Sequence, residues 1–138
     1  MSQENVERAK RGYAAFNDAY KTGEFRPVIE EFFDPGIVFK PAGILPEGPA
    51  EIHGHDELLD FTARQAEAFE DLSMTPAQFI DAGDRVVVPL TLGGQARFSG
   101  IPIEFSFVHI GTYRGGKVVR VEVYDSLDQA LEAAGLSE

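Results

Sequence analysis

Apolar residues recur at helical spacing in the first half of the chain. An amphipathic helix is expected over residues 3–22, where apolar side chains follow one another every three or four positions. A shorter helix is expected over 26–33, because Pro27 suits a first helical turn and the Asp34-Pro35-Gly36 sequence stops it. A third helix is expected over 55–70. Its apolar face consists of Leu58, Leu59, Thr62, Ala66 and Phe69.

The apolar period changes to two from residue 72 onward, which is typical of β-strands. Four strands are predicted, at 72–82, 85–92, 103–113 and 117–125, after a short strand at 37–40. The expected reversals between the four strands lie at Gly83-Asp84, at Gly93-Gly94 with 99–102, and at Gly115-Gly116.

The chain ends in a further short helix. Ser126 and Gln129 have the spacing of a capping box, and Gly135 suits the end of the helix. Two prolines, Pro76 and Pro89, fall within the predicted strands, and each is expected at a sheet edge or a bulge because proline lacks a backbone donor.

This order of elements predicts an α+β fold. Consecutive strands with short connections form an antiparallel meander, and the helices that precede them must cover one of its faces. We expect one domain over 1–138: a cone-shaped, curved antiparallel sheet with three N-terminal helices on its concave face and a short C-terminal helix. A sheet curved in this way encloses a cavity.

Alternation along the last two strands predicts which side chains face that cavity. The more apolar face of 103–113 carries Phe105, Phe107 and His109. In 117–125 the corresponding face carries Val119, Val121, Val123 and Asp125. We therefore expect His109 and Asp125 to project inward.

The opposite face of these strands leads to a prediction about assembly. It carries Val108, Ile110, Val118 and Tyr124. If these side chains are partly exposed, they form an apolar patch of the kind that marks an oligomer contact. We predict a homodimer through the outer face of the sheet.

Charge and composition exclude several classes of function. The 23 acidic and 12 basic residues give a net charge of −11, and no basic patch is present for nucleic acid or an anionic membrane. The chain has no cysteine, which excludes thiol catalysis and disulfides and fits the cytoplasm. No apolar run approaches the ~20 residues of a membrane span, and the first residues do not resemble a signal peptide. A cytoplasmic location is expected.

Three residues are candidates for catalysis. His109 is expected in an apolar pocket, which lowers a histidine pKa and leaves a neutral imidazole able to move a proton. Asp125 could pair with His109, and Tyr13 could donate a hydrogen bond to a ligand oxygen. The plainer interpretations are a hydrogen-bonded core histidine, an aspartate that starts a helix, and a core tyrosine.

Aromatic side chains are the candidate walls of a pocket for a flat apolar ligand, although most aromatics in a domain are simply core. The candidate ligand-binding residues are Phe16, Tyr20, Phe39, His53, Phe61, Phe105 and Phe107. A metal site at His53, His55 and His109 is an alternative for the histidines. Since Gly54 is expected to begin the helix, the first two imidazoles need not converge, and no metal is expected.

Several segments, taken in order, resemble the SnoaL-like polyketide cyclase family, within the superfamily of nuclear transport factor 2 and ketosteroid isomerase. They are residues 9–17, 32–35, 52–58, 79–88, 107–110 and 116–120. The resemblance extends over about residues 4–136. It implies a cone-shaped α+β barrel of the cystatin-like type, usually dimeric, with an apolar pocket and no cofactor. The fold hosts isomerases, cyclases, dehydratases, epoxide hydrolases and binding modules, so it does not fix the function.

Two departures from the superfamily argue against particular activities. Lys40 stands where the resemblance to ketosteroid isomerase would place the aspartate base, and Val123 stands where limonene epoxide hydrolase carries an aspartate. Tyr13 is offset by one residue from the isomerase's oxyanion tyrosine. We therefore predict a protein that binds a small apolar molecule in an internal pocket. It is either an isomerase, cyclase or dehydratase that uses His109 for proton transfer, or a non-catalytic binding or dimerisation module.

Overall fold

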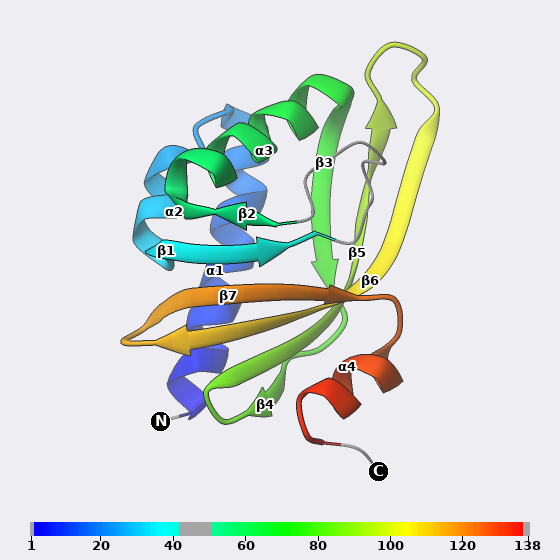
Figure 1. Cartoon of the computed structure of the whole chain (residues 1–138). Helices are drawn as coiled ribbons and strands as arrows, with labels where there is room; N and C mark the ends of the chain where they lie inside the picture. Colours follow the sequence, from blue (N-terminus) through cyan, green and yellow to red (C-terminus); the bar gives the residue numbers. More distant parts are fainter. Residues whose placement is uncertain (1, 42–50, 137–138) are drawn as a thin grey trace.

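The chain folds around one curved sheet in a computed structural model that describes residues 2–41 and 51–136 (Figure 1). The helices are α1 (Ser2–Thr22), α2 (Arg26–Phe32), α3 (Gly54–Ala68) and α4 (Leu127–Ala133). The strands are β1 (Phe33–Lys40), β2 (Ile52–His53), β3 (Phe69–Pro76), β4 (Ile80–Ala82), β5 (Arg85–Ala96), β6 (Pro102–Arg114) and β7 (Lys117–Tyr124). The predicted α+β class is confirmed, and no described helix is long and apolar enough to cross a membrane.

Seven strands form the sheet in the order β2-β1-β7-β6-β5-β3, with β4 paired to β5. The expected antiparallel meander is correct for β5, β6 and β7. The sheet is nevertheless mixed, because β1 runs parallel to β7. A parallel pair needs a long connection instead of a tight turn, and here most of the domain lies between its two strands. The turn residues that predicted the hairpins therefore could not predict the parallel pairing of β1 with β7.

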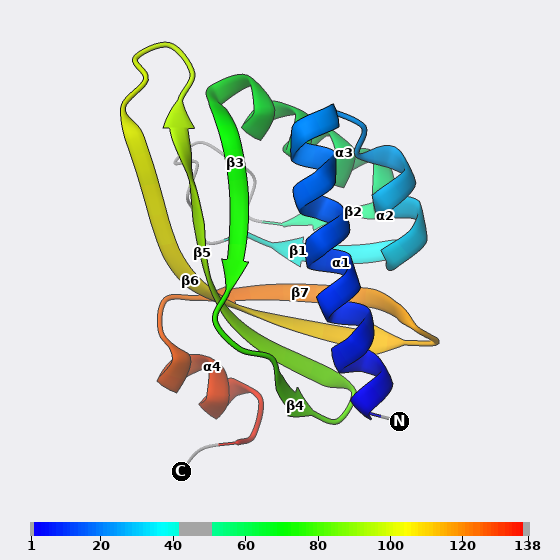
Figure 2. The ribbon, with the colours of Figure 1, turned by 180° about the vertical axis from the view of Figure 1, so that it is seen from behind.

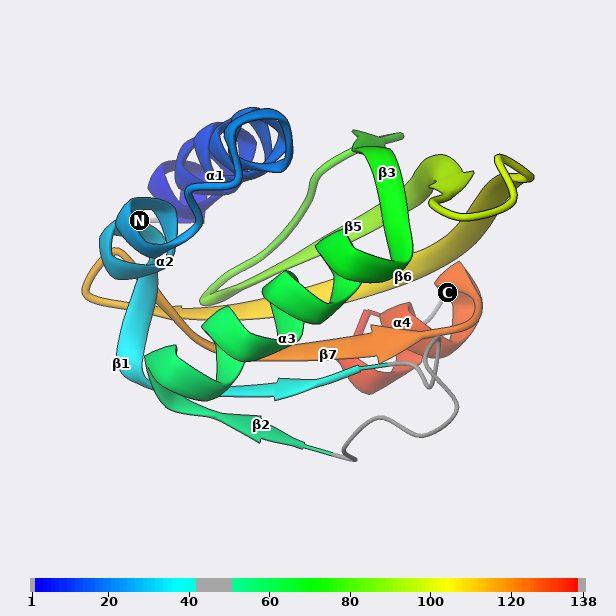
Figure 3. The same cartoon turned by 90° about the horizontal axis from the view of Figure 1, so that it is seen from above.

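The three N-terminal helices cover one face of the sheet, as predicted, and α4 lies on the other (Figures 2 and 3). Two clusters of buried apolar side chains fill the space between the helices and the sheet. One is centred on Phe16, Ile29 and Ile37, and the other on Val86, Val88 and Phe107. These clusters hold α1, α2 and α3 at a fixed position over the strands.

The expected strand at 72–82 consists of two separate strands. β3 ends at Pro76, β4 begins at Ile80, and the backbone amide of Ala77 between them donates to the carbonyl oxygen of Pro89 at 2.8 Å. Pro76 therefore ends β3, while Pro89 lies inside β5, opposite the break between β3 and β4. This is the kind of position at which the loss of a ladder donor is tolerated.

The third reversal was placed too early in the sequence. Gly93 and Gly94 lie inside β5, and the chain turns at residues 97–99 before β6. The reason for glycine at position 94 is close packing. A Cβ atom there would come within 2.8 Å of the carbonyl oxygen of Glu70 in β3.

Part of the outer face of the sheet is covered by helix α4. Val108 and Ile110 are buried in a cluster with Ala130 and Ala134 of α4, so they form no exposed patch. The serine cap of α4 is formed as predicted, with Ser126 Oγ accepting from the amide of Gln129 at 3.2 Å. The argument for a dimer from an exposed patch is therefore wrong, and the homodimer itself stays a prediction.

Candidate functional site

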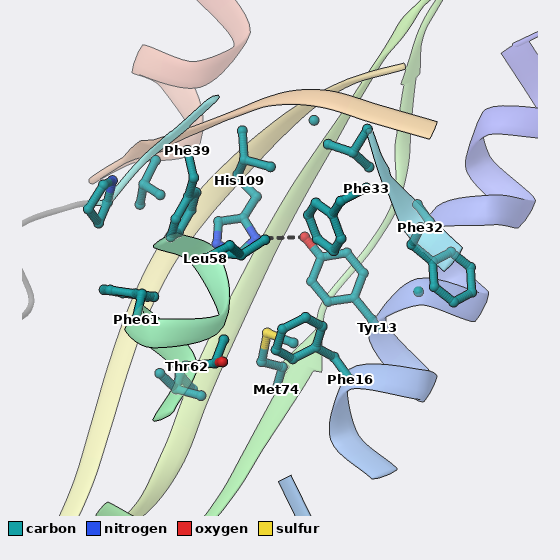
Figure 4. A pocket seen from close by; sticks show the side chains of 18 of the residues that line it. Tyr13, Phe16, Phe32, Phe33, Phe39, Leu58, Phe61, Thr62, Met74 and His109 are labelled. Carbon is teal, nitrogen blue, oxygen red and sulfur yellow. Dashed lines mark hydrogen bonds between the residues drawn. The ribbon is translucent and has the colours of Figure 1, made fainter. Parts of the chain in front are cut away.

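A cavity of about 150 Å³ lies between the helices and the sheet (Figure 4). Its wall is formed by α1, α2 and α3 on one side and by β1, β3, β5, β6 and β7 on the other. An apolar cavity of this size can hold a molecule about as large as benzene. That this cavity is a pocket for a ligand stays a prediction.

Most of the predicted aromatic residues border the cavity. Those in its wall are Phe16, Tyr20, Phe39, Phe61 and Phe107. Phe39 and Phe61 meet edge to face, with their ring centroids 5.4 Å apart, and Phe16 meets Tyr20 in the same way at 5.7 Å. Such contacts fix the ring positions and leave an apolar surface toward the cavity. Their role as ligand contacts stays a prediction.

Two predicted ligand-binding residues lie elsewhere. Phe105 is not part of the cavity wall and packs against Phe69, with the ring centroids 6.4 Å apart. His53 is exposed, and its Nε2 lies 3.1 Å from a carboxylate oxygen of Glu51. The strand pattern gave the face of Phe105 correctly, but the cavity ends before this residue is reached.

The chemical centre of the cavity is a hydrogen bond between Tyr13 and His109. The phenol oxygen of Tyr13, on α1, lies 2.7 Å from Nδ1 of His109, on β6 (Figure 4). The two rings are nearly parallel, with centroids 5.9 Å apart, and the ring of Phe107 flanks the imidazole at 5.3 Å. The structure thus brings two of the three predicted catalytic side chains into contact.

Burial keeps both partners uncharged. It lowers the pKa of His109 from 6.5 to about 4 and raises the pKa of Tyr13 well above its usual value of 10.0. In each case the cause is removal from water, which disfavours the imidazolium and the phenolate. At neutral pH the pair therefore consists of a neutral imidazole and a neutral phenol.

The direction of the hydrogen bond follows from the number of groups left without partners. If Tyr13 donates to Nδ1, the imidazole proton is on Nε2, and among the described residues only that N–H lacks a partner. If Nδ1 donates instead, both the phenol proton and the Nε2 lone pair lack partners. We therefore assign Tyr13 as the donor, since unpaired buried groups are unfavourable. His109 borders the cavity, so Nε2–H is available to a ligand.

The third predicted catalytic residue, Asp125, does not reach the cavity. It is exposed and lies just beyond β7, which ends at Tyr124. The cavity wall from this strand consists of Val118, Val121 and Val123. The expected inward position of Asp125 is therefore wrong, because strict alternation was extended past the end of the strand.

A register shift explains the other error in β7. Tyr113 pairs with Val118, whereas its neighbour Thr112 pairs with Arg120, so Val119 is an extra residue in the ladder. A β-bulge of this kind reverses the facing of the side chains before it. Val118 is therefore buried against the cavity, where Val119 was expected, while Val121 and Val123 face inward as predicted.

The cavity contains few charged groups. No aspartate or glutamate of the described residues borders it, and the titratable side chains in its described wall are Arg8, Tyr13, Tyr20, His109 and Tyr113. The Arg8 guanidinium donates to the backbone carbonyl oxygens of Gly116 and Glu31. A carboxylate base for carbon acids is therefore missing from the described part of the wall.

The histidine pair near α3 forms no metal site. His55 Nε2 lies 2.8 Å from the carbonyl oxygen of Phe33, while His53 faces Glu51. Within 2–41 and 51–136, no three histidine, aspartate or glutamate side chains are placed to bind a metal ion. The two imidazoles diverge because Gly54, with φ +83°, turns the chain into α3 between them.

Two buried polar residues of α3, Thr62 and Gln65, were not among the predicted site residues. They are the buried polar side chains of the described chain, at 2% and 8% exposure, and both border the cavity. Together with Leu58 they occupy positions i, i+4 and i+7 of one helix face. A glutamine within that apolar helix face was the feature of the sequence that could have identified Gln65 as a candidate site residue.

Solved structures described as NTF2-like or as having a ketosteroid isomerase-like fold share the fold of this chain. Residues 13–121 match the SnoaL-like domain, and the chain belongs to that family. The resemblance found in the sequence is thereby confirmed. No curated protein sequence is similar enough to count as a relative of this chain.

Solved structures share the fold over nearly the whole chain. An NTF2-like protein of unknown function from Burkholderia pseudomallei K96243 is 24% identical, with a TM-score of 0.75 over 94% of this chain and 95% of that one. TerC, co-crystallised with polyporic acid, is 27% identical, with a TM-score of 0.74 over 96% and 98%. A putative SnoaL-like polyketide cyclase from Jannaschia sp. CCS1 is 22% identical, with a TM-score of 0.70 over 99% and 94%.

Proposed function

We propose that this protein binds a small, uncharged aromatic ketone or hydroxy compound in the cavity and that His109 moves a proton at the oxygen of that ligand. The observation that supports this most directly is the Tyr13–His109 hydrogen bond inside an apolar wall. Isomerisation, cyclisation and dehydration all need such a proton transfer at oxygen. The family membership is consistent with each of them.

The chemistry follows from the protonation state of the pair. With Nδ1 accepting from Tyr13, Nε2–H donates to a carbonyl oxygen of the ligand. When that oxygen gains negative charge as an enolate forms, the hydrogen bond strengthens in the apolar surroundings. The proton taken from carbon goes to water or hydroxide, because the described wall offers no carboxylate. Proton transfer from Nε2 to the oxygen then gives the enol. Nε2 takes back a proton from the solvent species that accepted the one from carbon, so that His109 and Tyr13 both end neutral.

The wall also limits the class of ligand. Its only described cation, Arg8, already donates to two backbone carbonyl oxygens and lies 5.0 Å from the centre of the Phe32 ring. A charged ligand would have no free counter-charge in a low-dielectric site. The co-crystallisation of TerC with polyporic acid supports binding of a small organic molecule in this fold.

Binding without turnover is the second candidate function. The observation that favours it is that no aspartate or glutamate of the described residues borders the cavity. In that case the Nε2–H donor of His109 would only orient the ligand. The two candidates share the same ligand contacts and differ in whether the protein speeds a proton transfer.

One probe separates the two candidates. 1-Indanone is a small ketone whose hydrogens on carbon 2 exchange with deuterium through the enol, and indane is the same framework without the oxygen. We expect calorimetric binding of 1-indanone in preference to indane, and faster deuterium exchange by NMR than in buffer alone. Binding without faster exchange would establish the binding module. Equal or absent binding of both compounds would overturn the proposed function.

His109→Asn is the informative variant, because its side chain can still accept from Tyr13 but has no group at the position of Nε2. We expect the exchange rate to fall about 100-fold or more, which is typical for loss of a general acid. His53→Asn is the matched control, since it makes the same substitution at an exposed histidine outside the cavity wall. It should exchange like the unmodified protein. An unchanged rate in His109→Asn would exclude His109 from the reaction.

A further inference from the structure

Gln65 buries an amide group with no hydrogen-bond partner among the described residues. The residue is only 8% exposed, lies on α3 and borders the cavity. Its neighbour Thr62 differs, because the Thr62 hydroxyl donates to the carbonyl oxygen of Leu59 at 2.8 Å. Buried amides in folded proteins are almost always hydrogen-bonded, so this one requires an explanation.

The position of the amide in the wall provides that explanation. No completely enclosed side-chain nitrogen or oxygen in the described chain lacks a partner, so the Gln65 amide keeps accessible surface of its own. It can therefore be reached by a molecule in the cavity. An amide in this position has both a donor and an acceptor free, and it carries no charge.

Gln65 and His109 approach the cavity from different layers of the fold. Gln65 lies on the helical side, about one turn after Thr62 in α3. His109 lies on strand β6, and Figure 4 shows Thr62 and His109 on the two layers. The side chains around them in the wall are mainly aromatic and aliphatic. Gln65 and His109 are therefore two polar positions of the cavity that lie in different layers of a largely apolar wall.

We infer that Gln65 is a specificity-determining residue that binds a second oxygen of the ligand, so that the ligand class is an uncharged aromatic ketone bearing an additional hydroxyl or carbonyl group. This inference rests on the proposed ligand cavity and specifies its substrate class. His109 holds the reacting oxygen, and Gln65 holds the second one. A ligand with one oxygen leaves the amide unpaired, and this loss gives the discrimination.

The test compares 1-indanone with its 4-, 5- and 6-hydroxy derivatives by titration calorimetry. We expect at least one hydroxy isomer to bind about tenfold more tightly than 1-indanone, as one well-placed hydrogen bond allows. In Gln65→Met, which has a similar length and no amide, that preference should disappear. The affinity for 1-indanone itself should change less than about threefold.

Gln129→Met is the matched control, because it makes the same change at an exposed glutamine on helix α4. It should retain the preference. A second measurement follows the side-chain amide resonances of Gln65 by NMR, which should shift with the preferred hydroxy isomer and much less with 1-indanone. A structural role for the amide would move neither resonance selectively.

The outcomes separate this inference from the proposed proton transfer. If the preference depends on Gln65 but no ligand undergoes faster exchange, the inference stands and the proposed catalysis fails. If 1-indanone exchanges through His109 but Gln65→Met keeps the preference, or no isomer is preferred, the inference is overturned and the catalysis stands. If none of these compounds binds, both are overturned.

Discussion

Tyr13 and His109 lie 96 positions apart in the sequence, and their side chains meet at 2.7 Å in the cavity. Burial acts on the two groups in opposite directions, raising the pKa of the phenol and lowering that of the imidazole. Both consequently remain neutral over a wide range of pH. A neutral imidazole with one nitrogen held by a phenol presents a single N–H to the cavity, which suits recognition of a carbonyl oxygen.

Stability should depend on pH through His109. Its pKa falls from 6.5 in the unfolded chain to about 4 in the folded protein. Between these values the unfolded chain binds more protons, so the free energy of unfolding decreases as the pH falls from 6.5 to 4. At 1.36 kcal/mol per pKa unit, this group accounts for a loss of about 3 kcal/mol. Denaturant unfolding at a series of pH values measures the loss.

His109→Asn isolates this contribution from that of the carboxylates. The variant lacks the imidazole, so its free energy of unfolding should fall by about 3 kcal/mol less over the same pH range. His53→Asn should follow the unmodified protein. Parallel curves for the His109→Asn variant and the unmodified protein would show that burial does not lower the pKa of His109.

Tyr13→Phe should allow the imidazole of His109 to adopt both neutral tautomers. In the unmodified protein we expect the proton on Nε2, because Nδ1 accepts from Tyr13. Without the phenol both tautomers become accessible, and the unpaired nitrogen lowers the free energy of unfolding by about 1–2 kcal/mol. Imidazole ¹⁵N chemical shifts distinguish the tautomers. A proton on Nδ1 in the unmodified protein would contradict the assigned direction of the bond.

The sequence was sufficient to predict the elements whose pattern is local. The helical period identified α1, and the alternation in β6 placed Phe107 and His109 on the inner face. The predicted inward or outward orientation of side chains was wrong where one extra residue shifted the strand register. Because of the bulge at Val119, the cavity wall contains Val118 in place of the predicted Val119. The amino-acid composition of the strand does not reveal this bulge. Sequence alternation alone cannot locate such a bulge.

Contacts between distant segments were the other limit of the sequence. The final helix was predicted from its serine cap, but its packing over Val108 and Ile110 was not, and this led to an incorrect exposed patch. The Tyr13–His109 contact joins a helix to a strand from opposite ends of the chain. Both residues were identified separately as candidates, and only the three-dimensional fold shows that they meet.

Gln65→Met should make the ligand-free protein more stable. The amide is buried without a described partner, and an apolar side chain of similar volume removes that unfavourable burial. We expect the free energy of unfolding to rise by about 1 kcal/mol, measured by denaturant titration. Gln129→Met, at an exposed position, should change it little. A large loss of stability in Gln65→Met would indicate that the amide has a structural partner in the folded chain.

Asn17 should contribute to stability by joining α1 to the sheet. Its amide nitrogen donates to the carbonyl oxygen of Met74 at 2.9 Å, and its amide oxygen accepts from the backbone N–H of Met74 at 2.8 Å. β3 lies at one end of the main strand order, and Asn17 pairs with its backbone there. Asn17→Ala removes both bonds and leaves two backbone groups unpaired, which should cost about 2–3 kcal/mol.

Asn5→Ala is the comparison for this substitution. Asn5 lies on the same helix and makes one bond, from its amide nitrogen to the carbonyl oxygen of Gly83 at 3.2 Å, in an exposed setting. Its loss should cost less than about 0.5 kcal/mol, as for most surface changes. Thermal or denaturant unfolding of the two variants gives the difference. Equal losses in the free energy of unfolding would mean that the two hydrogen bonds of the Asn17 amide stabilise the protein no more than one surface hydrogen bond.

Gly94 should tolerate no side chain, unlike its neighbour Gly93. A Cβ atom at Gly94 would lie 2.8 Å from the carbonyl oxygen of Glu70 and 3.1 Å from Leu72 Cδ2. At Gly93 the nearest atom is 3.8 Å away, which is an ordinary contact. Gly94→Ala must push β3 away from β5 and should cost about 2–3 kcal/mol, whereas Gly93→Ala should stay within about 1 kcal/mol. Because the two glycines are adjacent in one strand, similar stabilities for the two variants would show that β3 can shift without loss of packing.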